Sequence, residues 1–215
     1  MRKAPFEDPN RARRYEAWYA GPGKRPDLLE KRLLGKLLAG FVEARSALDV
    51  GCGTGHFTRW LVAKGLQAFG MDLSRSMLEE ARRLGSPVCV RGDALALPFA
   101  DRAVDLVFMV TTLEFVGDPA RALAEAARVA RQGLLLGVLN RWSVVALQRR
   151  LVPSPVWASA RFFSPRSLVR LLEAVIGPRI DSLVWRTTLW PLAHLSDLPL
   201  PWGGFIGLAA HLRRE

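Results

Sequence analysis

Short apolar runs alternate with helix-like segments along most of this 215-residue chain. The runs predicted as strands are residues 47–50, 66–72, 87–94, 104–110 and 133–140, and the segments with helical spacing are 25–41, 56–65, 74–85, 118–130 and 164–177. Strands that alternate with helices predict a parallel sheet with helices on both faces. Right-handed crossovers make the doubly wound arrangement the default for such a sheet.

Two further predicted strands, residues 180–190 and 203–212, follow each other with no helix between them. Because a parallel connection needs a long crossover, we expect this pair to close one edge of the sheet in antiparallel fashion. The expected fold class is therefore α/β, with a doubly wound, mainly parallel seven-stranded sheet and an antiparallel edge strand.

The first predicted strand ends in the glycine-rich stretch DVGCGTG, residues 49–55. Ligands of open α/β sheets bind beyond the carboxyl ends of the strands. Glycine at such an end allows positive φ or close approach of a ligand to the main chain, although a bare structural turn is the competing interpretation. Two nucleotide fingerprints do not fit. The dinucleotide motif needs glycine where His56 stands, and the P-loop needs a lysine after the glycines.

Acidic residues end the two strands that follow. Asp72 ends the second predicted strand and Asp93 the third. A carboxylate at Asp72 can accept hydrogen bonds from both hydroxyls of a ribose, and one at Asp93 can accept from the exocyclic amine of adenine. Asp49 could accept from an ammonium group. The apolar walls expected for the adenine ring are Leu73, Met77 and Leu95.

Four motifs in order, LDVGCGTG, GMDLSRSML, RGDALALPF and VDLVFMVTTLEFVGDP, resemble those of class I S-adenosylmethionine-dependent methyltransferases. The nearest branch is the ubiquinone-biosynthesis-like one known as methyltransferase type 11. The resemblance covers about residues 15–140 and, more loosely, the stretch PWGGFIGLAAH. It implies a Rossmann-like fold, S-adenosyl-L-methionine as cofactor with S-adenosyl-L-homocysteine as product, and in-line methyl transfer to a small molecule.

The resemblance also implies which residues contact each part of the cofactor. The glycines and Thr54 line the methionine part, and Thr111 lies beside the sulfonium. Asp72 holds the ribose hydroxyls, while Asp93 and Ala94 bind the adenine edge. The full predicted cofactor-binding set is Asp49, Gly51, Cys52, Gly53, Thr54, Asp72, Leu73, Met77, Asp93, Ala94, Leu95 and Thr111.

A general base is needed only where the methyl acceptor must lose a proton. Glu114 is the acidic candidate, a solvated or capping carboxylate being the alternative. Phe115 stands where similar proteins often carry histidine, so no histidine role carries over at that point. Of the three histidines, His56 is interpreted as structural or adjacent to the cofactor, His194 could face the substrate, and His211 lies near the end of the chain.

Substrate recognition is expected from two irregular parts of a single domain, residues 1–215. Residues 1–40 are predicted to form an N-terminal helical lid, and residues 141–163 a substrate-side insertion. Their aromatic residues favour a mostly apolar or planar acceptor, with ordinary core packing as the alternative. The substrate candidates are Tyr15, Tyr19, Trp142 and Trp157.

The formal net charge is +11, from 31 basic and 20 acidic residues. Such a surplus can attract nucleic acid. The arginines are scattered, however, and TTLEF at residues 111–115 lacks the Asn/Asp-Pro-Pro-aromatic sequence of amino methylases that hold a flipped base. A tRNA or rRNA methyltransferase therefore stays as one alternative, and a non-catalytic cofactor-binding regulator as a second.

Cysteine positions and hydropathy argue against metal-binding, disulfide-rich, secreted and membrane-spanning proteins. Cys52 and Cys89 form no C-x-x-C pair and no cluster with histidine, so we expect neither a metal site nor a disulfide framework. The chain opens without the apolar region of a secretory signal, and no charge-free run reaches about 18 residues. We expect a cytoplasmic protein without a membrane span.

Overall fold

The structure is a computed structural model, which describes residues 6–143, 146, 160–190 and 197–213. Two candidates from the sequence, Trp157 and His194, lie outside the described residues. Within these ranges, no helix combines the length and apolarity that a membrane crossing needs.

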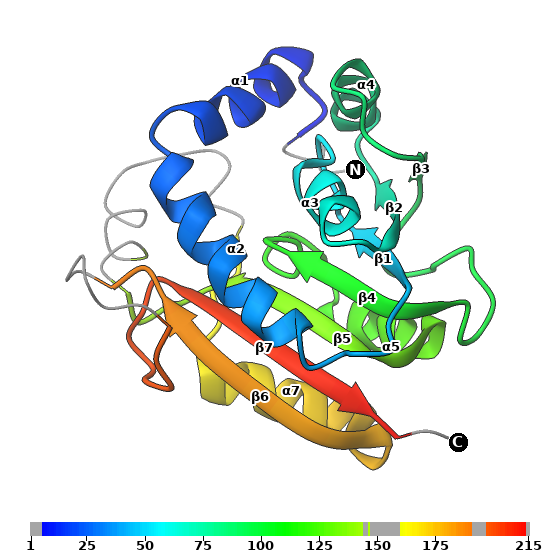
Figure 1. Cartoon of the computed structure of the whole chain (residues 1–215), viewed down its shortest axis with the longest axis vertical. Coiled ribbons are helices and arrows are strands. Elements are labelled where there is room, and N and C mark those ends of the chain that lie inside the picture. The colour runs from blue at the N-terminus through cyan, green and yellow to red at the C-terminus, as the bar shows by residue number, and fades with distance from the viewer. Residues whose placement is uncertain (1–5, 144–145, 147–159, 191–196, 214–215) are drawn as a thin grey trace.

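Seven strands form one sheet in the order β3-β2-β1-β4-β5-β7-β6 (Figure 1). They are β1 (Ser46–Val50), β2 (Gln67–Asp72), β3 (Cys89–Arg91), β4 (Val104–Val110), β5 (Ala130–Leu139), β6 (Ile180–Thr188) and β7 (Phe205–Leu212). The first five strands pair in parallel, and β7 runs antiparallel to both β5 and β6. The predicted fold class is confirmed, with β7 as the antiparallel strand and β6 outermost.

Helices cover both faces of the sheet (Figure 1). On one face lie α2 (Lys24–Leu38) and α3 (His56–Ala63), and on the other α5 (Pro119–Val129) and α7 (Pro165–Ile176), which a short 3₁₀ turn, Gly177–Arg179, connects to β6. Successive residues of β1 show the division, because side chains alternate across a strand. Ala47 packs with leucines of α2 and α3, whereas Leu48 packs with alanines of α5.

The two remaining helices are α1 (Pro9–Ala20) and α4 (Arg75–Arg83), and α4 also packs against β2 and β3. Helix α1 packs against α4, and the chain turns from α1 directly into α2. Asp8 caps α1 and Ser74 caps α4, each accepting a hydrogen bond from a backbone N–H of its first turn. The N-terminal segment thus passes over the end of the sheet where ligands of this fold class bind.

The third strand is shorter than its sequence predicts. It covers Cys89–Arg91 instead of residues 87–94, because it pairs only with the last three residues of β2. Gly92 follows, and Asp93 then turns the chain by accepting a hydrogen bond from the backbone N–H of Leu95 at 2.9 Å. The segment after the strand is therefore a loop beside the sheet end.

Candidate functional site

The glycine stretch between β1 and α3 is a tight turn in the left-handed region. Gly51 has φ of +76° and Gly53 has φ of +54°. A Cβ atom on Gly51 would lie 2.3 Å from Oγ1 of Thr112, so the segment directly after β4 leaves no room there. A Cβ on Gly53 would meet nothing nearer than 4.0 Å, where it would face Met77 and Tyr15. Gly51 is thus required by packing, and Gly53 presents bare main chain to open space.

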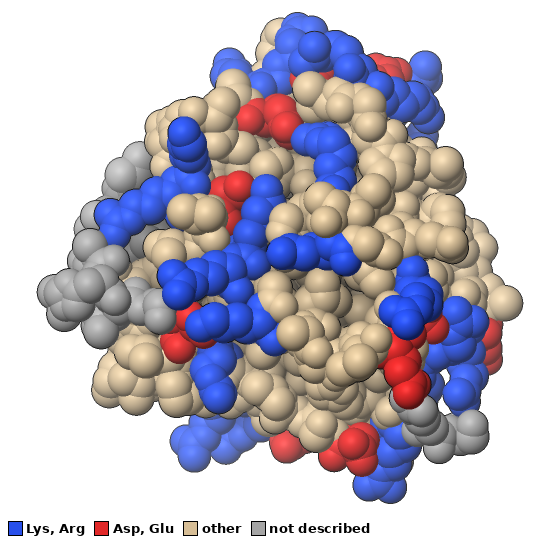
Figure 2. Space-filling model, viewed as in Figure 1, with Lys and Arg blue, Asp and Glu red and all other residues tan. Residues whose placement is uncertain are grey.

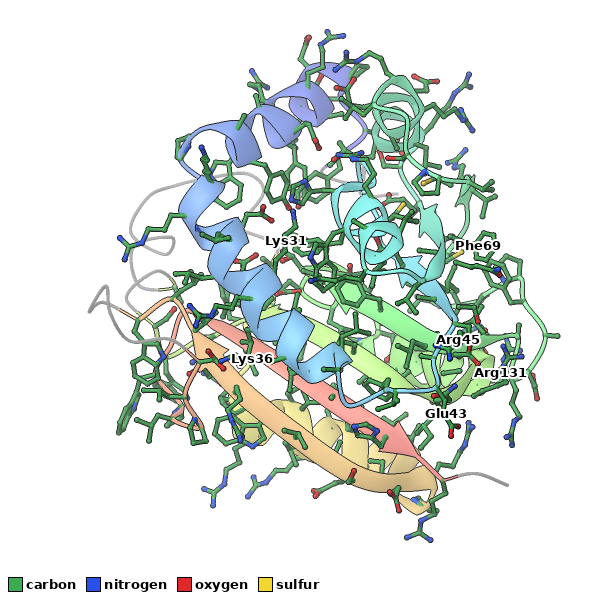
Figure 3. The ribbon with its side chains drawn as sticks, viewed as in Figure 1. Lys31, Lys36, Glu43, Arg45, Phe69 and Arg131 are labelled. Atoms are coloured by element: carbon green, nitrogen blue, oxygen red, sulfur yellow. The ribbon has the colours of Figure 1, made fainter. Side chains whose placement is uncertain are left out.

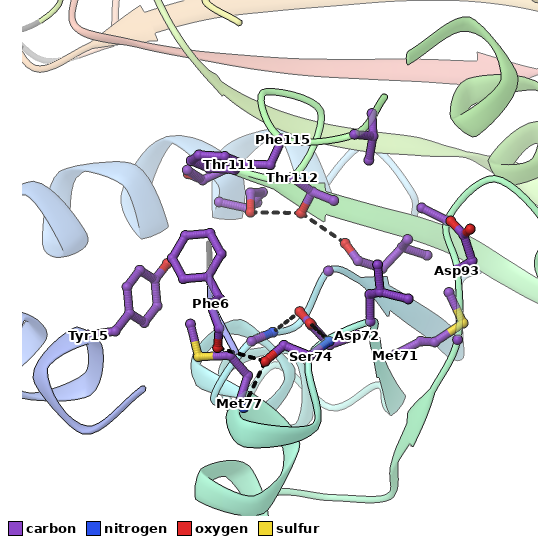
Figure 4. Close-up of a pocket in the computed structure, with 18 of the residues that line it drawn as sticks. Phe6, Tyr15, Met71, Asp72, Ser74, Met77, Asp93, Thr111, Thr112 and Phe115 are labelled. Carbon is purple, nitrogen blue, oxygen red and sulfur yellow. Dashed lines mark hydrogen bonds between the residues drawn. The ribbon is translucent and has the colours of Figure 1, made fainter. Parts of the chain in front are cut away.

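That open space is a cavity of about 660 Å³ beyond the carboxyl ends of the parallel strands (Figure 4). Both glycines line it, together with residues from the ends of β2 and β4, the loop after β3, and the N-terminal segment. Eleven of the sequence-predicted residues meet there: Tyr15, Tyr19, Gly51, Gly53, Asp72, Leu73, Met77, Asp93, Ala94, Leu95 and Thr111.

Asp72 links the glycine turn to the cavity. Its Oδ2 accepts a hydrogen bond from the backbone N–H of Gly53 at 2.8 Å, and its Oδ1 accepts one from Ser74 at 2.8 Å. Burial raises the pKa of Asp72, and these backbone N–H groups oppose the rise. Each carboxylate oxygen has two lone-pair sites, so the group can accept further hydrogen bonds from a ligand.

The end of β4 forms the facing wall. Thr111 has φ of +51°, an unfavourable conformation for a β-branched residue that costs about 1–3 kcal/mol. Thr112 Oγ1 donates to the backbone oxygen of Val50 at 3.0 Å, which ties β4 to β1 directly beside the glycine turn. Such strain persists where the surrounding structure fixes it, and it gathers at functional sites.

Three predicted cofactor residues support the turn without lining the cavity. Asp49 is buried, and its Oδ2 accepts from Thr58 Oγ1 at 2.6 Å. Cys52 is buried in a small cluster with Cys89. Thr54 Oγ1 donates to Glu16 of α1 at 2.5 Å. Their side chains therefore hold the loop in shape.

Burial of Asp49 gives a pH dependence that can be measured. Burial raises its pKa to about 7 against the model-peptide value of about 3.9. The folded state therefore holds a proton between about pH 4 and pH 7 that the unfolded state has lost, and stability falls as the pH rises through that window. We expect Asp49→Asn to remove this contribution. The free energy of unfolding of wild type minus that of D49N should decline from pH 4 to pH 7 and then level off in urea titrations. A difference that stays constant or rises over the same range would contradict this assignment.

The N-terminal helices are tied to the glycine turn by polar contacts. Glu16 of α1 accepts from Thr54 through one carboxylate oxygen and from Arg59 of α3 at 2.7 Å through the other. Tyr19 stacks on His56 with 3.6 Å between ring centroids. These contacts hold α1 over the turn and give His56 a structural role, one of the two interpretations that the sequence left open.

Helix α2 also contacts His56, next to the glycine turn. Asp27 Oδ1 lies 2.7 Å from Nε2 of His56, and Lys31 Nζ, which points from α2 toward α3 in Figure 3, lies 2.9 Å from Asp27. His211 stacks on Phe41 at the opposite end of α2, away from the cavity.

Two other candidates do not reach the cavity. Glu114 is 1% exposed, and its Oε1 accepts from the backbone N–H of Leu139 at 2.6 Å, which joins the loop after β4 to the end of β5. This contact gives Glu114 a structural task, and the geometry does not support it as a base. Trp142 is 62% exposed and is not among the cavity's lining residues.

The cavity also holds residues that were not among the site residues predicted from the sequence. Phe6, Trp18 and Glu30 of the N-terminal segment line it, as does Phe115. Ring contacts connect Phe115 to Phe6, Phe6 to Tyr15, Tyr15 to Tyr19 and Tyr19 to Trp18, with centroids 5.2–6.0 Å apart. We call these five residues, Phe6, Tyr15, Trp18, Tyr19 and Phe115, the aromatic wall.

Sequence and structure comparisons point to one family. Residues 48–136 match the family described as a methyltransferase domain. A crystal structure from Thermotoga maritima, described as a SAM-dependent methyltransferase and possible histamine N-methyltransferase, superposes with a TM-score of 0.78 at 29% identity, covering 94% of this chain and 96% of that one. The chain belongs to the class I S-adenosylmethionine-dependent methyltransferases. The predicted type 11 family and its cofactor, S-adenosylmethionine, are confirmed.

Curated relatives match this chain over part of their own length. An uncharacterized protein of Mycobacterium tuberculosis is 37% identical over 164 residues, which are 74% of this chain and 55% of the relative. The malonyl-[acyl-carrier protein] O-methyltransferase of Erwinia billingiae is 33% identical over 141 residues, 63% of this chain and 56% of that protein. The chain thus spans about half the length of the curated relatives it matches.

Proposed function

We propose that the chain is an enzyme that transfers the methyl group of S-adenosylmethionine to a small molecule held against the aromatic wall. The observation that carries this proposal is the bare main chain at Gly53, which faces the cavity that Asp72 and Asp93 also line. The cofactor supplies an activated methyl group on a sulfonium, so the protein's task is mainly to align the acceptor and exclude water.

The roles of the lining residues follow from their positions. Asp72 accepts hydrogen bonds from the ribose hydroxyls, and Asp93 with Ala94 meets the adenine edge. Leu73, Met77 and Leu95 pack on the ring, and Met77 lies across from Gly53. The glycine turn and Thr111 face the methionine part. Asp49, Cys52 and Thr54 do not contact the cofactor and act indirectly, by holding the glycine turn in shape.

A small acceptor is favoured by the way the N-terminal helices cover the site. Tyr15 and Tyr19 line the cavity and are half-buried, and α1 is anchored to α3 and α4. A nucleic acid would need a flipped base to pass this cover. We therefore propose residues 1–40 as the lid of a single domain. The substrate-side insertion expected over residues 141–163 stays a prediction, because most of that segment lies outside the described residues. A cytoplasmic location stays a prediction.

RNA remains the alternative because of charge. Figure 2 shows basic side chains gathered over α2, where Lys24, Arg25, Arg32 and Lys36 are exposed. One of them is already paired, since Lys36 Nζ lies 2.8 Å from a carboxylate oxygen of Asp197.

Calorimetry with S-adenosylmethionine, S-adenosylhomocysteine and NAD tests the cofactor site. We expect binding of the first two and none of NAD, because the dinucleotide fingerprint is missing. A methyl-label screen of small molecules against tRNA then tests the acceptor class. Label in small molecules supports the proposal. Salt-sensitive tRNA binding with label transfer to tRNA would replace it by the RNA alternative, and tight cofactor binding without transfer to any acceptor would favour the regulator.

A further inference from the structure

The cavity has two chemically different ends. Asp72 ends β2 and Asp93 follows β3 at one end, while Val110 and Leu139 are the last residues of β4 and β5 at the other. In the proposed function the adenosyl part takes the β2–β3 end. The methyl acceptor is then left with the β4–β5 end.

Glu30 of α2 belongs to the β4–β5 end. It lines the cavity and is 8% exposed. Leu33 and Leu34, one turn further along α2, pack in the same core cluster as Val110 and Leu139, which fixes where this part of α2 lies. The other lid residues with charge in the cavity, Arg11 and Arg14, lie on the first half of α1, the helix that packs against α4.

Two tyrosine rings of α1 line the same cavity as Glu30. The hydroxyl groups of Tyr15 and Tyr19 lie 3.1 Å apart in the cavity, and both rings belong to the aromatic wall. Burial raises the pKa of Tyr15 to about 12, with the charges of Glu30 and Asp72 adding to the rise, so the phenol stays neutral near pH 7. Glu30 is thus a carboxylate of α2 that shares a pocket with neutral rings.

Such a pocket selects by charge. A buried carboxylate attracts a cation and repels an anion, and the electrostatic effect is larger where water is excluded. Aromatic faces add a cation–π attraction for an ammonium group. An acceptor with a free carboxylate is disfavoured in the same place, because two carboxylates in one site repel each other.

We propose that the methyl acceptor is a small amine and that Glu30 binds its ammonium group between α2 and the aromatic wall. This inference rests on the proposed function and names the substrate class for the same site.

In the methylation of such an amine, Glu30 acts as the proton acceptor. The ammonium gives one proton to the carboxylate, which leaves a neutral amine with a free electron pair. The amine nitrogen forms a bond to the methyl carbon, the carbon–sulfur bond breaks, and its electron pair stays on sulfur to give S-adenosylhomocysteine. The positive charge passes to the methylated nitrogen, and Glu30 returns its proton to water when the product leaves.

Matched ligands test the proposal through binding. The probes are three sets of amine, alcohol and acid: butylamine, butanol and butyrate; phenethylamine, phenethyl alcohol and phenylacetate; tryptamine, tryptophol and indoleacetate. Affinities are measured by calorimetry or ligand-observed NMR, with and without S-adenosylhomocysteine. We expect at least one amine to bind about tenfold or more tightly than its own alcohol and acid, a difference of about 1.4 kcal/mol.

Glu30→Gln keeps the size of the side chain and removes its charge. We expect it to weaken amine binding about tenfold, to leave alcohol binding within about twofold, and to leave S-adenosylhomocysteine affinity unchanged. Glu173→Gln, at an exposed position on α7, is the matched control and should change none of these affinities. Thermal midpoints and the S-adenosylhomocysteine affinity show whether E30Q is folded.

Failure of this inference differs from failure of the proposed function. If S-adenosylhomocysteine binds but every amine binds no better than its alcohol or acid, the amine assignment is wrong and the methyltransferase site stands. Unchanged amine affinity in folded E30Q would also overturn it. If E30Q does not fold, the wild-type comparison within each set still decides. Lack of S-adenosylhomocysteine binding would instead remove the proposed function on which the assignment depends.

Discussion

Replacing Gly51 with alanine is expected to lower the free energy of unfolding by about 2–5 kcal/mol and to abolish S-adenosylhomocysteine binding. A left-handed conformation costs a non-glycine residue about 1–2 kcal/mol. The new Cβ would also lie 2.3–2.9 Å from three side-chain atoms of Thr112, and overpacking of this kind costs about 1–3 kcal/mol more. Thr112 cannot easily turn away, because its hydroxyl is held by Val50 and Val110.

Gly65→Ala separates the two costs. Gly65 has φ of +90° but nothing within 4 Å of an added Cβ, so this variant should lose only the conformational term. Urea unfolding of both variants measures the difference. Thr112→Ala combined with Gly51→Ala should recover part of the loss, since it removes the two closest atoms. Equal destabilisation by G51A and G65A, with no coupling to Thr112, would mean that β4 does not press on the turn.

The ends of the first strands could be predicted because local signals agree there. The glycines mark the end of β1, Asp72 is the last residue of β2 and Asp93 stands just beyond β3, where parallel strands bring their carboxyl ends to one edge. The Ser74 cap likewise fixed the start of α4. All these features lie within a few residues of the element that they end or begin, so they are readable without tertiary contacts.

Residues placed by distant packing could not be predicted in this way. Glu30 stands in an amphipathic helix, and only the packing of α2 against the sheet buries it at the cavity. Phe6 reaches the cavity because its backbone oxygen accepts a hydrogen bond from Ser74, which is 68 residues away. Glu114 reads as an exposed acid after a strand, but β5 supplies a backbone N–H that draws it inward. The left-handed backbone of Thr111 has no sequence signal, since β-branched residues disfavour it.

Among the side chains that we propose to contact the cofactor, Asp72 carries the largest expected effect on ligand affinity. Asp72→Ala removes a carboxylate that we propose to accept from the ribose hydroxyls, and hydrogen bonds to a charged group contribute about 1.5–3 kcal/mol each. It also leaves the backbone N–H groups of Gly53 and Ser74 without their partner. We expect S-adenosylhomocysteine and S-adenosylmethionine to bind at least about tenfold more weakly, which corresponds to about 1.4 kcal/mol or more.

Two comparisons show which part of that loss belongs to the ligand. Asp181→Ala, at an exposed position on β6, should leave affinity unchanged. Adenosine and 2′-deoxyadenosine, both tested as competitors, probe the hydroxyl contact itself. Wild type should prefer adenosine, because the deoxy compound lacks one donor to Asp72, and D72A should lose that preference while keeping a folded thermal transition. If D72A binds both nucleosides with the wild-type difference, the carboxylate serves only the glycine turn, and the ribose must be held by another part of the cavity.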